Sequence, residues 1–261
     1  MTDVLKVTIK GQGIPLVLIH GWGLNSGIWQ PLVNKLAPYL KVITIDLPGY
    51  GTNIDHTIAS YCLADIARQV VQAVNEPAIY AGWSLGGLVA TEIATEYKSA
   101  SLGLVTIASS PCFVAQSLPQ PWPGIKANLL ADFHQQLSQD TGKTIAGFLK
   151  IQAMGSPHIR QDLKEIKQLI MQYDTPQQQV LDDSLALLET VDLRQKLSDI
   201  NIPFLRLYGR LDSLIPKTVI PLVDELAPKS VGHVFAKASH APFISHAEDF
   251  FNVLLSWLAS T

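Results

Sequence analysis

The chain has 261 residues, of which 48% are hydrophobic and 16% are charged, and its formal net charge is −3. Because an average domain carries about 25% charged residues, this composition favours strands that are covered on both faces, as in a parallel sheet. The balance of 19 basic and 22 acidic residues excludes a generally basic nucleic-acid-binding protein. The two cysteines form no disulfide framework, the N-terminus lacks a signal-peptide pattern, and no apolar run approaches the ~18 residues of a membrane span. We therefore expect a cytoplasmic protein that binds neither nucleic acid nor a membrane.

The first 110 residues alternate short apolar runs, rich in β-branched side chains, with stretches of helical periodicity. The runs that predict strands cover residues 14–19, 42–45, 78–81 and 104–108. A helix is expected from Ser60 to Val74, where apolar residues recur at the i, i+3, i+4 spacing of one buried face, and another from Leu88 onward. Strands that alternate with helices in this way predict a parallel, doubly wound sheet of the α/β class.

The strand pattern stops at Pro111. From there to about Leu193 the sequence shows helical segments separated by proline and glycine, and no convincing strand. Ser156-Pro157 and Thr175-Pro176 are each typical of a helix start, because proline is favoured at the first helical position. This stretch is too long and too regular for a loop, and we expect it to form a helical insertion.

Strands are predicted again over 204–208 and 231–235, with helices over 218–226 and 246–258. The order of elements therefore predicts one α/β core with a doubly wound sheet, into which a helical cap is inserted. The core is assigned to residues 1–110 and 194–261, and the cap to residues 111–193.

A glycine-flanked serine follows the predicted strand 78–81, in the sequence Gly82-Trp83-Ser84-Leu85-Gly86. The pattern G-x-S-x-G is typical of a nucleophile elbow, a sharp turn from strand to helix that holds the serine hydroxyl above a sheet. Small residues must flank the serine because the turn crowds the backbone. The pattern alone is common, and the predicted strand before it and helix after it are what favour Ser84 as a nucleophile.

A serine hydroxyl becomes a nucleophile only when a base accepts its proton and a carboxylate orients the base. In doubly wound hydrolases these groups follow in the order serine, acid, histidine. Of the seven histidines, His240 fits best because it follows the last predicted strand, at the carboxyl edge where open α/β sheets bind ligands. The others lie before the serine, in the insertion, within a predicted strand or at a helix start (His20, His56, His134, His158, His233 and His246).

The acid is expected at the same edge of the sheet. Asp212 follows the predicted strand 204–208, whereas Asp199 precedes it and Asp224 lies in a predicted helix. Asp46 ends an early strand, where a role in the turn before Pro48 is the simpler interpretation. The predicted catalytic residues are therefore Ser84, Asp212 and His240.

Attack on an ester also needs two hydrogen-bond donors for the oxyanion. In an elbow one donor is the backbone N–H after the serine, here that of Leu85, and the other comes from the loop after an early strand. His20-Gly21-Trp22-Gly23 is that loop, so the N–H of Trp22 is the second predicted donor. Removing one such donor typically lowers the rate by ~10²–10³.

Other chemistries are less compatible with the sequence. No Cys/His or His/Glu grouping has the spacing of a metal site. Gly11-x-Gly13 precedes a strand instead of following one, which argues against a dinucleotide loop. We expect an enzyme without a cofactor or a metal ion.

These motifs resemble those of the α/β-hydrolase superfamily along the whole chain. A narrower resemblance is to the BioH-type pimeloyl-[acyl-carrier protein] methyl ester esterases of biotin biosynthesis. It rests on His20-Gly21-Trp22-Gly23-Leu24-Asn25, on residues 82–90 and on Ala108-Ser109-Ser110-Pro111-Cys112-Phe113. It continues with Trp122-Pro123-Gly124-Ile125, residues 205–209 and residues 235–246.

The resemblance implies a serine carboxylesterase that hydrolyses the methyl ester of pimeloyl-acyl-carrier protein and releases methanol. It also implies a monomer in which a segment of the helical insertion contacts the substrate together with the catalytic residues. The substrate-binding residues implied in this way are Trp22, Ser84, Leu85, Phe148, Leu149, Lys150, Ile151, Gln152 and His240.

The partner implied by the resemblance is acyl-carrier protein, which is strongly acidic and docks on basic residues of the insertion. Lys143, Arg160 and Lys164 match such positions. By spacing alone, Arg160, Lys164 and Lys167 share one helix face, an arrangement that is also typical of an ordinary solvated surface. Gly147 stands where an arginine is expected, which predicts weaker or shifted docking.

Two other functions remain open from the sequence. The first is a broad esterase, lipase or thioesterase that acts on small free substrates with the same residues. The second is a catalytically silent ligand receptor built on the same scaffold, against which the intact serine, aspartate and histidine argue.

Overall fold

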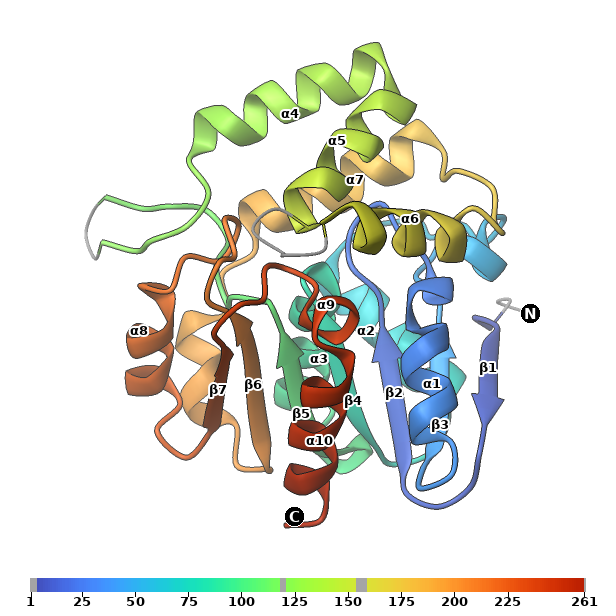
Figure 1. The fold of residues 1–261 in the computed structure, drawn as a ribbon, viewed down its shortest axis with the longest axis vertical. Helices are drawn as coiled ribbons and strands as arrows, with labels where there is room; N and C mark the ends of the chain where they lie inside the picture. The colour runs from blue at the N-terminus through green and yellow to red at the C-terminus, as the bar shows by residue number, and fades with distance from the viewer. Residues whose placement is uncertain (1–3, 118–120, 154–158, 261) are drawn as a thin grey trace.

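Residues 4–117, 121–153 and 159–260 are described by the computed structural model, apart from the side chains of residues 151–153 and 162. The strands of this part of the chain form one seven-stranded sheet in the order β1-β3-β2-β4-β5-β6-β7 (Figure 1). They are β1 (Val7–Lys10), β2 (Pro15–Ile19), β3 (Lys41–Ile45), β4 (Ala78–Trp83), β5 (Ser101–Ile107), β6 (Phe204–Gly209) and β7 (Val231–Phe235). All neighbours are parallel except β1, which is antiparallel to β3. The predicted α/β fold with a mostly parallel sheet is confirmed.

The central strands are buried on both faces, which explains why they appear in the sequence as apolar runs without alternation. All six residues of β4 are buried. One core lies between the sheet and helices α2 (Leu63–Val74), α3 (Leu85–Glu96) and α8 (Val219–Leu226). A second core lies between the other face and helices α1 (Gln30–Leu36) and α10 (Ala247–Leu258). None of the described helices is long and apolar enough to cross a membrane.

Strand β1, helix α1 and the four-residue helix α9 (Pro242–Ser245) of the core were not predicted. Strand β1 is an edge strand with three exposed residues out of four, so it carries no apolar run. Helix α1 has only seven residues, too few to show a helical period. Helix α2 begins at Leu63 and not at Ser60, because the backbone is still extended at Cys62.

The helices between β5 and β6 lie over the carboxyl ends of the parallel strands (Figure 1). These cap helices are α4 (Ala127–Gln139), α5 (Thr141–Ala153), α6 (Ile159–Ile170) and α7 (Gln178–Thr190). Helix α7 begins just after Thr175-Pro176, near the predicted start, whereas Ser156-Pro157 lies outside the described residues. Residues 111–193 stay our proposed limits for the cap, and 1–110 with 194–261 those for the core.

Candidate active site

The nucleophile elbow forms where β4 passes into α3. Ser84 has φ 54° and ψ −117°, a conformation that is costly for a residue with a side chain and that is concentrated at functional sites. A Cβ atom on Gly82 would lie 1.9 Å from the carbonyl oxygen of Gly86, and one on Gly86 would lie 2.4 Å from that of Ile19. Because only glycine fits at either position, the G-x-S-x-G pattern follows from the close approach of three backbone segments.

Two hydrogen bonds with strand β5 and the residues that directly follow it hold the backbone of Ser84. Its N–H donates to the carbonyl oxygen of Ile107 over 2.9 Å, and its own carbonyl accepts from the Ser109 hydroxyl over 2.8 Å. No role for Ser109 was predicted from the sequence. The available signal was a small polar residue just after the strand that pairs with β4, at the same edge of the sheet.

His240 and Asp212 lie against each other at the carboxyl edge of the sheet. The Nδ1 atom of His240 is 2.8 Å from Oδ2 of Asp212, and both side chains are almost completely buried. The other oxygen of Asp212 accepts the backbone N–H groups of Leu214 and Ile215 over 2.8 and 3.1 Å. These bonds hold the carboxylate in one orientation, because both of its oxygens have donors.

The pairing with Asp212 decides which nitrogen of His240 carries the proton. An ionised carboxylate only accepts hydrogen bonds, so Nδ1 must be the protonated nitrogen and Nε2 the acceptor. Nε2 is buried and has no hydrogen-bond partner among the described residues. The indole N–H of Trp83, next to Ser84, donates to the carbonyl oxygen of His240 over 2.8 Å. The imidazole lies against the ring of Trp83, with 5.7 Å between the ring centroids, and it has a free lone pair.

The loop after β2 approaches the elbow closely. A Cβ atom on Gly21 would lie 3.3 Å from the Cβ of Ser84. The backbone N–H groups of Trp22 and Leu85 donate to no backbone or side-chain acceptor within the described part of the chain. Two unused donors next to a serine are the arrangement that an oxyanion requires.

The indole of Trp22 connects this loop to the cap. It is fully buried, and its N–H donates to the carbonyl oxygen of Leu181 in α7 over 2.9 Å. Its ring packs edge-on against Phe133 of α4 and Phe148 of α5, with centroid distances of 5.1 and 5.2 Å. The residue that carries a predicted oxyanion donor is therefore held by three cap helices.

Comparison with known proteins identifies the family. The model of the alpha/beta hydrolase family matches residues 16–253, which is most of the chain. This protein belongs to the alpha/beta hydrolase family.

Solved structures similar to this alpha/beta hydrolase include two esterases and a bromoperoxidase. An esterase from Exiguobacterium antarcticum is 24% identical, with a TM-score of 0.85 over 98% of this chain and 95% of that one. A thermophilic esterase from Thermogutta terrifontis is 20% identical, with a TM-score of 0.80 over 98% and 93%. A bromoperoxidase from Bacillus anthracis is 22% identical, with a TM-score of 0.83 over 97% and 94%. At these identities the likeness establishes the fold alone.

Within this hydrolase, the side chains of the predicted substrate-binding segment of α5 lie in two different places. Phe148 packs against Trp22, whereas Leu149 and Lys150 line a cavity between α5 and α6. The side chains of Ile151 and Gln152 lie outside the described residues. The structure thus brings Phe148 into contact with the Trp22 loop, and it places Leu149 and Lys150 elsewhere in the cap.

The predicted docking residues lie on the surface of the cap. Lys143 is exposed on α5, and Arg160 and Lys164 are exposed on α6. None of the three forms an ion pair with another described residue. A Cβ atom on Gly147 would have no neighbour within 4 Å, so the space for a longer side chain is open there.

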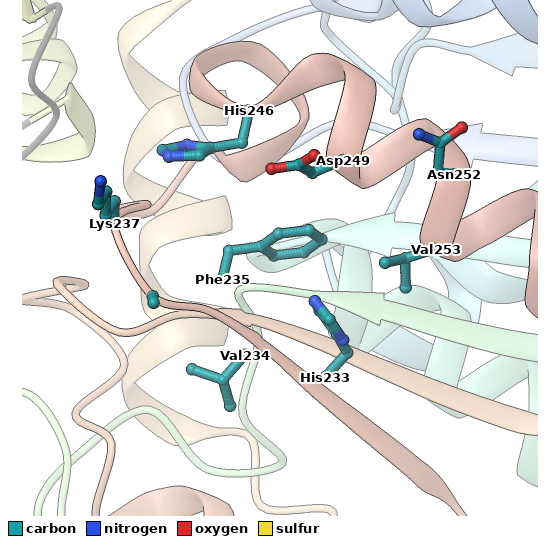
Figure 2. A pocket seen from close by; sticks show the side chains of 9 residues that line it. His233, Val234, Phe235, Lys237, His246, Asp249, Asn252 and Val253 are labelled. Atoms are coloured by element: carbon teal, nitrogen blue, oxygen red, sulfur yellow. The ribbon is translucent and has the colours of Figure 1, made fainter.

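Two of the histidines not chosen as the base line a cavity of about 530 Å³ at the edge of the sheet. Figure 2 shows His233 of β7 facing this space together with His246 and Asp249, which lie at the start of α10. Ser84 and His240 are not among its lining residues. This cavity is thus separate from the elbow.

His20 and Asp46 are buried and support the loops around the elbow. The N–H of Leu47 donates to Nε2 of His20 over 3.0 Å, which leaves Nδ1–H to donate to the Gly21 carbonyl over 2.8 Å. Burial lowers the pKa of His20, and the nearby Asp46 carboxylate offsets only part of this effect. Asp46 accepts four hydrogen bonds, two each from Ser26 and Thr52. Its role is wider than the turn that the sequence suggested, because it joins two loops.

Proposed function

We propose that this protein is a serine carboxylesterase whose catalytic residues are Ser84, Asp212 and His240. The observation that carries the proposal is the buried 2.8 Å contact between His240 and Asp212, which leaves Nε2 of His240 without a partner, together with the strained backbone of Ser84 at the elbow. A positioned base with a free lone pair is what a serine nucleophile needs.

In the proposed reaction, Nε2 of His240 accepts the proton of Ser84 as its Oγ atom attacks the ester carbonyl. The N–H groups of Leu85 and Trp22 donate to the tetrahedral oxyanion. His240 then gives its proton to the departing alkoxide, and an acyl-enzyme ester remains on Ser84. A water molecule deprotonated by His240 attacks this ester, and the free acid leaves.

We further propose pimeloyl-[acyl-carrier protein] methyl ester as the substrate, with methanol as the leaving alcohol. The support is the motif resemblance together with three exposed cations on the cap, at Lys143, Arg160 and Lys164. An acidic carrier would be attracted to unpaired cations at this surface. The cytoplasmic location and the monomeric state stay predictions.

The first experiment is incubation of the enzyme with the pimeloyl-carrier methyl ester, followed by mass measurement of the carrier. We expect a mass decrease of one CH2 unit, the signature of demethylation. Ser84→Ala should lower kcat by about 10⁴–10⁶, since removal of a triad serine has an effect of this size. Ser101→Ala is the control, because the Ser101 hydroxyl is buried and has no hydrogen-bond partner among the described residues. Near-normal turnover by Ser84→Ala would refute the proposed mechanism.

A broad esterase acting on small free esters is the alternative, and the positive charge of the cap surface is the feature that discriminates between the two. The double variant Arg160→Glu/Lys164→Glu should raise KM for the carrier-bound ester and leave KM for a small soluble ester unchanged. The difference should be larger at low ionic strength, because screening is weaker. Equal effects on both substrates would favour the broad esterase. Failure of a fluorophosphonate probe to label Ser84 would favour the silent receptor.

A further inference from the structure

A second cavity, of about 440 Å³, lies between the cap and the core. We call it the cap cavity. Helices α5 and α6 form its walls, residues 173–176 close one end, and Gly23 and Asn25 of the core form its floor. Its described lining includes neither Ser84 nor His240. Its volume is within the range of about 300–1,000 Å³ that is common for small-molecule sites.

The walls of the cap cavity are mainly apolar. Ile145 and Leu149 lie one turn apart on α5, and Leu163 and Ile170 face them from α6. Two helices that present apolar side chains to the same space form a slot, which suits an alkyl chain better than a compact polar solute.

Charge in the cap cavity comes from Lys150, Lys167 and Asp174. No described residue forms an ion pair with any of the three. Both lysines are exposed: Lys150 directly follows Leu149 on α5, and Lys167 lies between Leu163 and Ile170 on α6. Together these three side chains give the cap cavity a net charge of +1. A ligand with one negative charge would therefore neutralise it.

The floor of the cavity holds α6 in place. The side-chain amide of Asn25 donates to the carbonyl oxygen of Ile170 over 3.0 Å and accepts the N–H of Gly27 over 3.1 Å. A Cβ atom on Gly27 would lie 2.4 Å from the carbonyl oxygen of Leu169, so the end of α6 rests directly on the core. The cavity is therefore formed before any ligand binds.

We propose that the cap cavity is a binding site for a medium-chain aliphatic monocarboxylate. The alkyl chain lies along the apolar faces of α5 and α6, and the carboxylate lies between Lys150 and Lys167. A monoanion matches the net charge, whereas a dianionic phosphate would leave an excess negative charge next to Asp174. This site does not depend on the esterase proposal, because binding can be measured on protein that is unable to turn over.

The test is calorimetric titration of Ser84→Ala protein with hexanoate, octanoate and decanoate. Each added methylene should lower Kd about threefold to fourfold, because burial of one CH2 group is favourable by ~0.8 kcal/mol. Decylamine should bind much more weakly than decanoate, since its charge repels both lysines. Affinity that does not depend on chain length or on the sign of the charge would refute the proposal.

Matched variants locate the binding. Lys167→Gln should weaken decanoate binding about fivefold, whereas Lys164→Gln, one turn earlier on α6 and outside the lining, should leave Kd unchanged. Ala146→Trp should abolish binding by filling the cavity from an exposed position that folding tolerates. Wild-type enzyme blocked at Ser84 by a fluorophosphonate should still bind decanoate. Loss of binding on blocking, or equal effects of the two lysine variants, would place the ligand elsewhere and overturn the proposal.

Discussion

Ser109 holds Ser84 in its strained conformation by bonding to the backbone of Ser84, and not to the reactive hydroxyl of Ser84. Its hydroxyl donates to the carbonyl of Ser84, and a Cβ atom on Gly87 would lie only 2.3 Å from its Oγ atom. This crowding leaves the Ser109 hydroxyl little freedom. The orientation of Ser84 is therefore set in part by the segment that follows β5, which carries none of the proposed catalytic residues.

Ser109→Ala should lower kcat about fivefold to tenfold and leave KM almost unchanged. The variant loses one hydrogen bond, worth ~1 kcal/mol, at the point that holds the nucleophile in its strained conformation. Steady-state kinetics with a soluble ester measure both constants. Ser101→Ala is the control, because it removes a buried hydroxyl that has no partner among the described residues. Equal kinetics for the two variants would mean that Ser109 does not position the nucleophile.

Helix α7 is the cap element most closely tied to the core loops. Beside the bond from Trp22 to Leu181, the hydroxyl of Tyr50 lies 2.6 Å from that of Ser184. Burial raises the pKa of Tyr50, so its hydroxyl stays protonated at this contact. Both contacts join segments more than 100 residues apart. A displacement of α7 would therefore move the loop that carries one of the proposed oxyanion donors.

Trp22→Phe should lower kcat about threefold to tenfold and stability by ~1 kcal/mol. Phenylalanine keeps a ring between Phe133 and Phe148 but loses the indole donor to Leu181. The N–H of Trp22 stays in the chain, so the loss should be smaller than removal of an oxyanion donor. Kinetics and urea unfolding measure the two effects.

Trp29→Phe is the matched control for this change. The indole nitrogen of Trp29 is buried and has no hydrogen-bond partner among the described residues, so this variant alters ring size alone. If both tryptophan variants keep full kcat, the contact with α7 does not position the Trp22 loop.

The elements differ in how much of their structure the sequence could predict. Strands β2, β4 and β7 were predicted within two residues, because buried or β-branched runs are local properties. Edge strand β1 and helix α1 were missed because one is exposed and the other short. Their stability comes from the neighbouring elements.

The stability of the whole molecule should fall below neutral pH because of His20. Burial keeps the folded-state pKa of His20 below the usual value of about 6.5. As the pH falls through 6.5, the unfolded chain binds a proton at this residue and the folded protein does not. Stability is therefore present above this pH and is lost as the pH falls, by at most ~1.4 kcal/mol per pH unit for one group.

Urea unfolding at pH 7.5 and 5.5 measures this loss. His20→Gln should reduce the difference between the two pH values, and His233→Gln, at the half-buried edge of the sheet, should not. Where His20→Gln is too unstable to purify, the imidazole signal of His20 in the wild-type protein provides its pKa by NMR. A folded-state pKa above 6.5 would contradict the prediction.

The sequence by itself determined the fold class, the elbow and the sheet edge at which Ser84, Asp212 and His240 are found. These features depend on local patterns: apolar runs, glycines at a crowded turn, and polar residues directly after strands. Only the tertiary structure decided which nitrogen of His240 is free, that Trp22 is bound to α7, and that Leu149 and Lys150 line a separate cavity. Such features arise from contacts between segments distant in the chain, and no local pattern of residues encodes the distance or orientation at which those segments meet.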